Sequence, residues 1–138
     1  MSVVAAVAAG VLLLAACGDA SNRSSDPGEH GAGTGTATGT VVDGVQQVRI
    51  EAGDNLRFSP STITVHPGKV TITLVNTGKG APHNLQLPGL PVADWVPLTS
   101  AGDSASATFT TPAPGTYTFV CSIHQRQGQT GQLIVLPN

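Results

Sequence analysis

Apolar and polar residues alternate with a period of two along most of the chain from residue 41 onward. The clearest runs cover residues 63–65, 70–74, 117–121 and 131–137. Such alternation is typical of β-strands that bury one face, and valine, isoleucine and threonine, which favour strands, dominate these runs. No stretch sustains the 3.6-residue period of an amphipathic helix. The pattern therefore predicts a domain built from β-strands.

Turn residues separate the predicted strands. Pro67 and Gly68 lie between the first two runs, and Pro114 and Gly115 precede the third. Residues 87–103 show no regular pattern and are expected to be irregular. About six to eight short strands of this kind suit a two-layered all-β fold. We expect a single domain, a Greek-key antiparallel β-sandwich, over residues 41–138.

Composition narrows the possible functions. The chain has 138 residues, of which 10% are charged, and its formal net charge is −2. A protein that binds nucleic acid would be expected to carry a basic stripe, so the charge balance argues against that class. Acidic and basic residues also balance within the predicted domain, so long-range electrostatic steering of a partner should be weak. We find no catalytic triad or paired carboxylates, and do not expect an enzyme.

The N-terminal part has two segments of different character. Residues 1–16 are apolar and shorter than the roughly 20 residues that span a bilayer. With Leu14-Ala15-Ala16-Cys17 they resemble a bacterial lipoprotein signal peptide, although the usual basic residue before the apolar run is lacking. Cys17 would then carry the lipid. Residues 17–40 lack large apolar side chains and are expected to form a flexible linker.

Three residues of metal-binding type fall at expected loop positions in the domain. His83 follows the run at 70–74, Cys121 ends the run at 117–121, and His124 comes shortly after. A thiolate and two neutral imidazoles form the trigonal ligand set that suits copper. Each residue alone has a plainer explanation, because a lone cysteine is often a buried apolar residue and histidines are common in loops. Of the other histidines, His30 lies in the linker and His66 in a turn, and neither is assigned a metal role.

Three segments together resemble the cupredoxin family, and within it plastocyanin-like blue copper proteins. They are "FSPSTITVHPGKVTITLVNTG", "APHN" and "CSIHQRQGQTGQLIV". The resemblance implies that His83, Cys121 and His124 bind one type 1 copper ion. The family's axial methionine falls on Gln129, and the only methionine in the chain is Met1. A stellacyanin-like axial glutamine is therefore expected at Gln129, with Gln127 as the alternative if the loop is shorter.

The resemblance also implies roles for neighbouring residues. Asn84 and Ser122 are expected to tie the two ligand loops together by hydrogen bonds, with the Asn84 backbone N–H as a candidate donor to the Cys121 sulfur. Gly128 and Gly131 are expected to let the ligand loop turn back into the last strand.

We predict a membrane-tethered blue copper protein that carries single electrons by Cu(II)/Cu(I) cycling. Redox partner proteins would dock transiently on a monomer near His124, and a lipid on Cys17 would hold it to the extracytoplasmic side of the cell membrane. The alternative is a lipoprotein for copper binding, delivery or tolerance without electron transfer. A third hypothesis is a metal-free sandwich with an adhesive or structural role.

Overall fold

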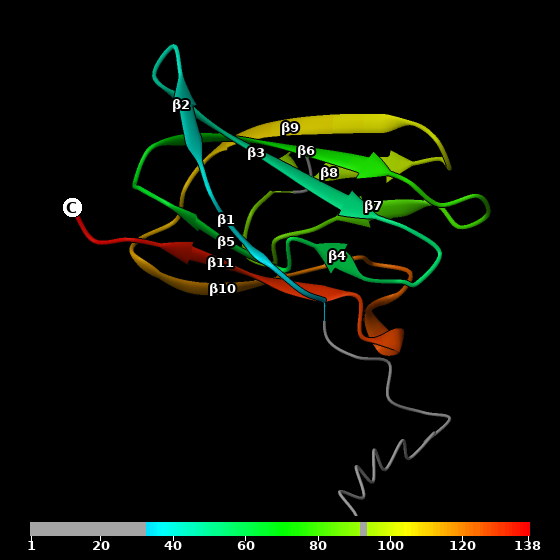
Figure 1. Cartoon of the computed structure of the whole chain (residues 1–138). Helices are drawn as coiled ribbons and strands as arrows, with labels where there is room; N and C mark the ends of the chain where they lie inside the picture. Colours follow the sequence, from blue (N-terminus) through cyan, green and yellow to red (C-terminus); the bar gives the residue numbers. More distant parts are fainter. Residues whose placement is uncertain (1–32, 92–93) are drawn as a thin grey trace, which may run out of the picture.

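The computed structural model describes residues 33–91 and 94–138. In this part the chain forms strands joined by short connections, and one 3₁₀ turn (Figure 1). The elements are β1 (Thr36–Thr38), β2 (Thr40–Val42), β3 (Val45–Ala52), β4 (Phe58–Ser59), β5 (Thr62–Val65), β6 (Lys69–Asn76), β7 (His83–Leu85), β8 (Val96–Thr99), β9 (Ser104–Thr110), β10 (Gly115–Val120), η2 (Gln125–Gln127) and β11 (Thr130–Val135). No helix among these residues is long and apolar enough to cross a lipid bilayer.

The strands form two main sheets that lie one on the other. One sheet has the order β1-β5-β11-β10, and the other has the order β2-β3-β6-β9, with β4 pairing with β3. Figure 1 shows β3, β6 and β9 in the upper layer and β5, β10 and β11 in the lower layer. β7 and β8 form a separate pair. The predicted all-β sandwich is confirmed.

The alternation read from the sequence matches the burial of β6. Val70, Ile72 and Leu74 point into the core and are almost completely buried. Thr71 and Thr73 face outward, where their hydroxyl groups bond Thr108 and Ser106 of β9 at 2.7 and 2.8 Å. Because successive side chains of a strand point to opposite faces, the apolar set of β6 closes the core while the threonines bridge neighbouring strands.

Aromatic residues fill the centre between the sheets. Phe58 and Phe119 are fully buried, and their ring centroids lie 5.2 Å apart in an edge-to-face arrangement. Such pairs contribute about 0.5–1.5 kcal/mol beyond the burial of their area. Phe119 lies two residues before Cys121, so this contact anchors the end of the strand that leads to the cysteine.

The strand pairing differs from the purely antiparallel arrangement that the sequence suggested. β1 and β11 each pair with β5 in parallel, and β3 pairs with β6 in parallel. The physical reason is the short connection through Pro67 and Gly68. Instead of folding β6 back onto β5, it carries the chain across to the other sheet, so each strand finds its neighbours elsewhere in the sequence.

The sandwich also begins earlier than expected. Thr36–Thr38 pairs with Thr62–Thr64, whereas the sequence predicts that the linker extends to residue 40. Backbone hydrogen bonds hold this edge strand, and only Ala37 packs against the core. A segment without large apolar side chains can therefore join a sheet that already exists. Cys17 and the predicted signal peptide lie outside the described residues.

Residues 87–103 contain a strand where irregular structure was expected. Val96–Thr99 forms β8 and pairs with β7, with His83 opposite Thr99. Val96 and Thr99 are buried, whereas Leu98 is exposed. The sequence does not predict this short strand because it has prolines at 91 and 97, and proline is uncommon within strands. The β7–β8 pair fixes the backbone of the segment that carries His83.

Candidate metal centre

The three predicted metal ligands come together from separate parts of the chain. His83 begins β7, Cys121 directly follows β10, and His124 directly precedes η2. Their candidate ligand atoms all lie within 4.8 Å of one another. In Figure 1, η2 is the orange coil at one end of the sandwich, beyond β11. The residues predicted from the sequence therefore form one cluster that can hold a metal ion.

A fourth donor atom converges on this cluster. The Oε1 atom of Gln129 lies 3.0 Å from Nδ1 of His83 and 3.1 Å from Nδ1 of His124. Nδ1 of His124 lies 3.5 Å from Sγ of Cys121. Two imidazole nitrogens, one sulfur and one amide oxygen thus face a common point.

The two histidines differ in how much of their surface is exposed. His83, Cys121 and Gln129 are completely buried, whereas His124 is half-buried and forms the edge of the cluster nearest to solvent. The His83 and His124 rings are tilted by 57° with centroids 5.1 Å apart, so both can direct Nδ1 inward.

Burial also lowers the pKa of His83. Desolvation is the main cause, and the positive charge that His124 can carry lowers it further. The Gln129 amide, the Gly53 carbonyl and Asp54 act in the opposite direction. Within residues 33–91 and 94–138, Nε2 of His83 has no hydrogen-bond partner, although the nearby Gly53 carbonyl favours the protonated imidazole. The lowered pKa of His83 favours the neutral imidazole, the form that binds metals.

The donor set fits a copper ion. Two neutral imidazoles and a thiolate match the trigonal copper arrangement with a weak axial ligand. The Nε2 atom of Gln129 is buried and has no hydrogen-bond partner among the described residues, whereas its Oε1 is directed at the two histidines. Burying the amide nitrogen of Gln129 without a hydrogen bond costs free energy. Such a cost is easier to understand if the amide oxygen contributes to metal binding.

Of the two glutamines considered, only Gln129 reaches the cluster. Gln127 lies in η2 and is exposed, whereas Gln129 is fully buried. The turn between them depends on Gly128, whose φ of 85° is in the left-handed region that favours glycine. The Gln129 N–H then bonds the His124 carbonyl at 3.2 Å, and the Cys121 N–H bonds the Gln129 carbonyl at 3.1 Å.

The predicted link between the ligand loops is present. The Asn84 side chain donates to Oγ of Ser122 at 3.0 Å and accepts from the Ser122 backbone N–H at 2.8 Å. Because Asn84 follows His83 and Ser122 follows Cys121, these bonds fix the two ligands relative to each other. The contact from the Asn84 backbone N–H to the Cys121 sulfur stays a prediction. The role expected for Gly128 is confirmed, whereas Gly131 lies within β11 against the Phe119 ring.

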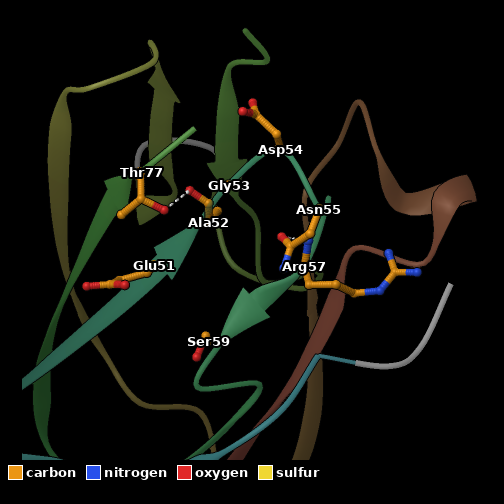
Figure 2. Close-up of a pocket in the computed structure, with 8 residues that line it drawn as sticks. All are labelled: Glu51, Ala52, Gly53, Asp54, Asn55, Arg57, Ser59 and Thr77. Carbon is orange, nitrogen blue, oxygen red and sulfur yellow. Dashed lines mark hydrogen bonds between the residues drawn. The ribbon is translucent and has the colours of Figure 1, made fainter. Parts of the chain in front are cut away.

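Sequence reasoning missed the segment between β3 and β4. Gly53, Asp54, Asn55 and Arg57 of this segment border an open cavity of about 300 Å³, whose lining is labelled in Figure 2. The segment includes Gly53 and Asp54, which affect His83, and Arg57, which bonds the ligand loop. A polar loop with charged residues is usually solvated, so the sequence carried no signal for this role. His66 is exposed and lies apart from the cluster, and His30 lies outside the described residues.

The comparisons with known proteins agree with this site. Auracyanin-B of Chloroflexus aurantiacus is 35% identical over 92 residues, which are 61% of this chain and 38% of that protein. The chain therefore matches well under half of auracyanin-B. Plastocyanin of Scenedesmus fuscus is 36% identical over 89 residues, 58% of this chain and 87% of that protein.

A solved structure supports the same relationship. Auracyanin A, described as a "blue" copper protein from Chloroflexus aurantiacus, matches with a TM-score of 0.60 and 26% identity. The match covers 67% of this chain and 99% of that one. A family model described as "Cupredoxin-like domain" matches residues 6–135. The chain is therefore a member of the cupredoxin-like domain family, homologous to the blue copper proteins auracyanin and plastocyanin.

Proposed function

We propose that this protein carries single electrons with one copper ion held by His83, Cys121 and His124, and with Gln129 as its axial ligand. The observation that carries the proposal is the convergence of Nδ1 of His83, Nδ1 of His124, Sγ of Cys121 and Oε1 of Gln129 on one point. When bound, copper supplies the one-electron Cu(II)/Cu(I) couple.

The protein's contribution is a site that already has its shape. His83 is fixed by β7 and by burial, and Cys121 by the end of β10 and its backbone bond to Gln129. Asn84 and Ser122 join the two loops that carry these ligands. Because the ligands are held in place, they rearrange little when the charge of the site changes, which favours electron transfer over open metal storage.

His124 provides the expected route for electrons. It is half-buried, and its neighbour Ile123 has 48% of its surface exposed. An imidazole edge beside an exposed apolar side chain suits short-lived docking of a redox partner. Ser122 and Gln125, on either side of this pair, carry no charge, so we expect such docking to depend weakly on salt.

The central experiment adds Cu(II) to a fragment of residues 33–138 and records its absorption spectrum. We expect an intense blue or green thiolate-to-copper band that ascorbate bleaches and a mild oxidant restores. Cys121→Ser is the matched control, because it removes the sulfur and should abolish the band. A pale complex that transfers copper to a chelator would favour the alternative role in copper delivery, and no binding would contradict both roles.

We also propose that the protein is tethered to the extracytoplasmic face of the cell membrane through a lipid on Cys17. The support is the apolar run that ends in Leu14-Ala15-Ala16-Cys17. The test is to express the full chain with a labelled fatty acid and compare it with Cys17→Ala. We expect label and membrane association only in the unaltered chain. Equal membrane association of both would exclude the lipid anchor.

A further inference from the structure

Arg57 is a buried arginine beside the metal centre. Only 8% of its surface is exposed. Its Nη1 donates to the Leu56 carbonyl at 2.6 Å and to the Gln127 carbonyl at 2.8 Å, across 70 residues of sequence. In Figure 2 its side chain extends away from the other labelled residues, toward the segment that carries η2. Arginine is rarely buried unless its charge has a specific use.

The turn that carries Arg57 has an unusual backbone. Leu56 has a φ of 54°, in the left-handed region that a leucine adopts only at a cost. Two bonds close the turn, from the Leu56 N–H to the Gly53 carbonyl at 2.9 Å and from the Arg57 N–H to Oδ1 of Asn55 at 3.1 Å. Backbone strain of this kind persists where the surroundings hold it, and it tends to occur at functional sites. In this protein, the conformation of the turn places the Arg57 side chain against the loop that carries Cys121 and His124.

Arg57 bonds a carbonyl group of the ligand loop, that of Gln127, which accepts no hydrogen bond from the loop's own described backbone. Within the loop, the His124 carbonyl accepts from Gln127 and Gln129, and the Gln125 carbonyl accepts from Gly128. The Gln127 carbonyl lies at the end of η2, where carbonyl groups lack partners within the turn. A bond from a charged donor is stronger than one from a neutral donor. Arg57 therefore fixes the loop two residues before Gln129.

The same turn also reaches the segment before the other buried ligand. Asp54 accepts from the backbone N–H groups of Lys79 and Gly80 at 3.0 and 3.2 Å, just ahead of His83. The residues 53–57 thus contact both segments that supply metal ligands, one through Asp54 and the other through Arg57.

We propose that Arg57 is a positioning residue that holds the loop 121–129 in its metal-binding shape before metal arrives. Its bond to the Gln127 carbonyl keeps Gln129 buried against His83 and His124. This inference rests on the proposed copper site for its purpose. Its structural content, a loop held by one arginine, is testable in the metal-free protein.

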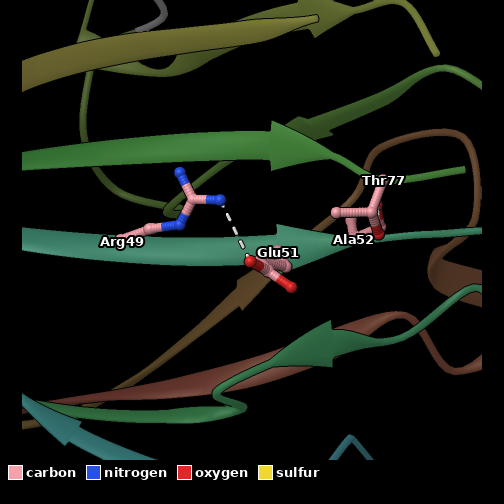
Figure 3. A network of polar contacts seen from close by, with 4 residues as sticks. All are labelled: Arg49, Glu51, Ala52 and Thr77. Carbon is pink, nitrogen blue, oxygen red and sulfur yellow. Dashed lines mark hydrogen bonds and ion pairs between the residues drawn. The ribbon is translucent and has the colours of Figure 1, made fainter. Parts of the chain in front are cut away.

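The test compares Arg57→Met and Arg57→Lys with the control Arg49→Met. Arg49 lies on the exposed side of β3, and within the described part of the chain its one ion pair is with Glu51 at 3.0 Å (Figure 3). Amide hydrogen exchange is measured in the metal-free full chain. The Cys121 and Gln129 amides, whose hydrogen bonds close the loop, report on the loop, and those of Ile72 and Leu74 report on the core.

We expect exchange at Cys121 and Gln129 to be roughly tenfold faster in Arg57→Met, the order expected when a charge-assisted hydrogen bond is lost. Exchange at Ile72 and Leu74 should stay the same relative to Arg49→Met. Arg57→Lys, which keeps one charged donor, should be intermediate and decides the question if Arg57→Met does not fold. Unchanged loop exchange would overturn the proposal. Equal acceleration in the loop and the core would also overturn it, because Arg57 would then serve general stability.

Copper affinity provides a second readout. Arg57→Met should bind copper about 10-fold or more weakly, as residues that orient ligands typically do when removed, and Arg49→Met should bind like the unaltered protein. If the unaltered protein binds no copper but the exchange pattern appears, the proposed function fails and the positioning role of Arg57 stands. If copper binds and loop exchange is unchanged, only this inference fails.

Discussion

Asn84 and Ser122 exchange hydrogen bonds in both directions across the two ligand loops. The Asn84 Nδ2 donates to Oγ of Ser122, and the Asn84 Oδ1 accepts from the Ser122 backbone N–H. Asn84 has only 8% of its surface exposed, so water cannot easily take its place. The pair joins the residues that directly follow His83 and Cys121.

Asn84→Ala should destabilise the metal-free protein by about 1–2 kcal/mol, because two hydrogen bonds of ordinary strength are lost. Urea unfolding of the fragment 33–138 measures this change. Ser122→Ala is the matched control. It keeps the bond from the backbone N–H to Asn84 and should lose about half as much. Equal losses in both variants would show that the backbone bond contributes nothing.

Gln129→Met should raise the reduction potential of the copper-loaded protein. An amide oxygen is a harder ligand than a thioether and favours Cu(II), so its replacement by sulfur favours Cu(I). Gln127→Met is the control, since Gln127 is exposed in η2 and should leave the potential unchanged. Spectroscopic redox titration measures both variants. An unchanged or lower potential in Gln129→Met would remove glutamine from the axial position.

Gly131→Ala should destabilise the fold by about 1–3 kcal/mol through overpacking. A Cβ at this position would overlap the Phe119 ring and lie 2.6 Å from the Ser61 carbonyl oxygen, which belongs to the backbone and cannot move aside freely. Gly80→Ala is the control, because no described residue other than its two chain neighbours lies within 4 Å of the added Cβ. Thermal unfolding should show a clear drop only for Gly131→Ala. Equal melting temperatures of both variants would contradict the packing around Phe119.

Asp54→Asn should destabilise the protein at neutral pH and have little effect in acid. The N–H groups of Lys79 and Gly80 hold the pKa of Asp54 below its usual value of 3.8. A carboxyl group with a lowered folded-state pKa stabilises the fold above its unfolded pKa, and this contribution is lost as the pH falls through the folded-state value. Urea unfolding between pH 7 and pH 2.5 should show the two proteins converge below pH 3.8. A difference that does not change with pH would contradict this origin.

The sequence was informative where residue type alone carries the chemistry. Cys121 and His124 stand at the spacing that lets one short loop supply two ligands, and the structure brings His83 to them. The alternation at residues 70–74 also predicted the buried face of β6, because the period of a strand is a local property of the backbone. The choice between Gln129 and Gln127 depended on the resemblance, and only the shape of the loop around Gly128 separates them in space.

What the sequence by itself determined is a β-sandwich with two imidazoles and a thiolate available for copper. The tertiary structure alone decided that β5 and β6 lie in different sheets, that Thr36–Thr38 joins the domain, and that Arg57 is buried against Gln127. The physical reason is the distance along the chain over which each feature is determined. The alternation of a strand and the chemistry of a ligand depend on one residue and its neighbours. The partners of a strand and the contact of Arg57 depend on segments up to 70 residues apart, which only the folded chain brings together.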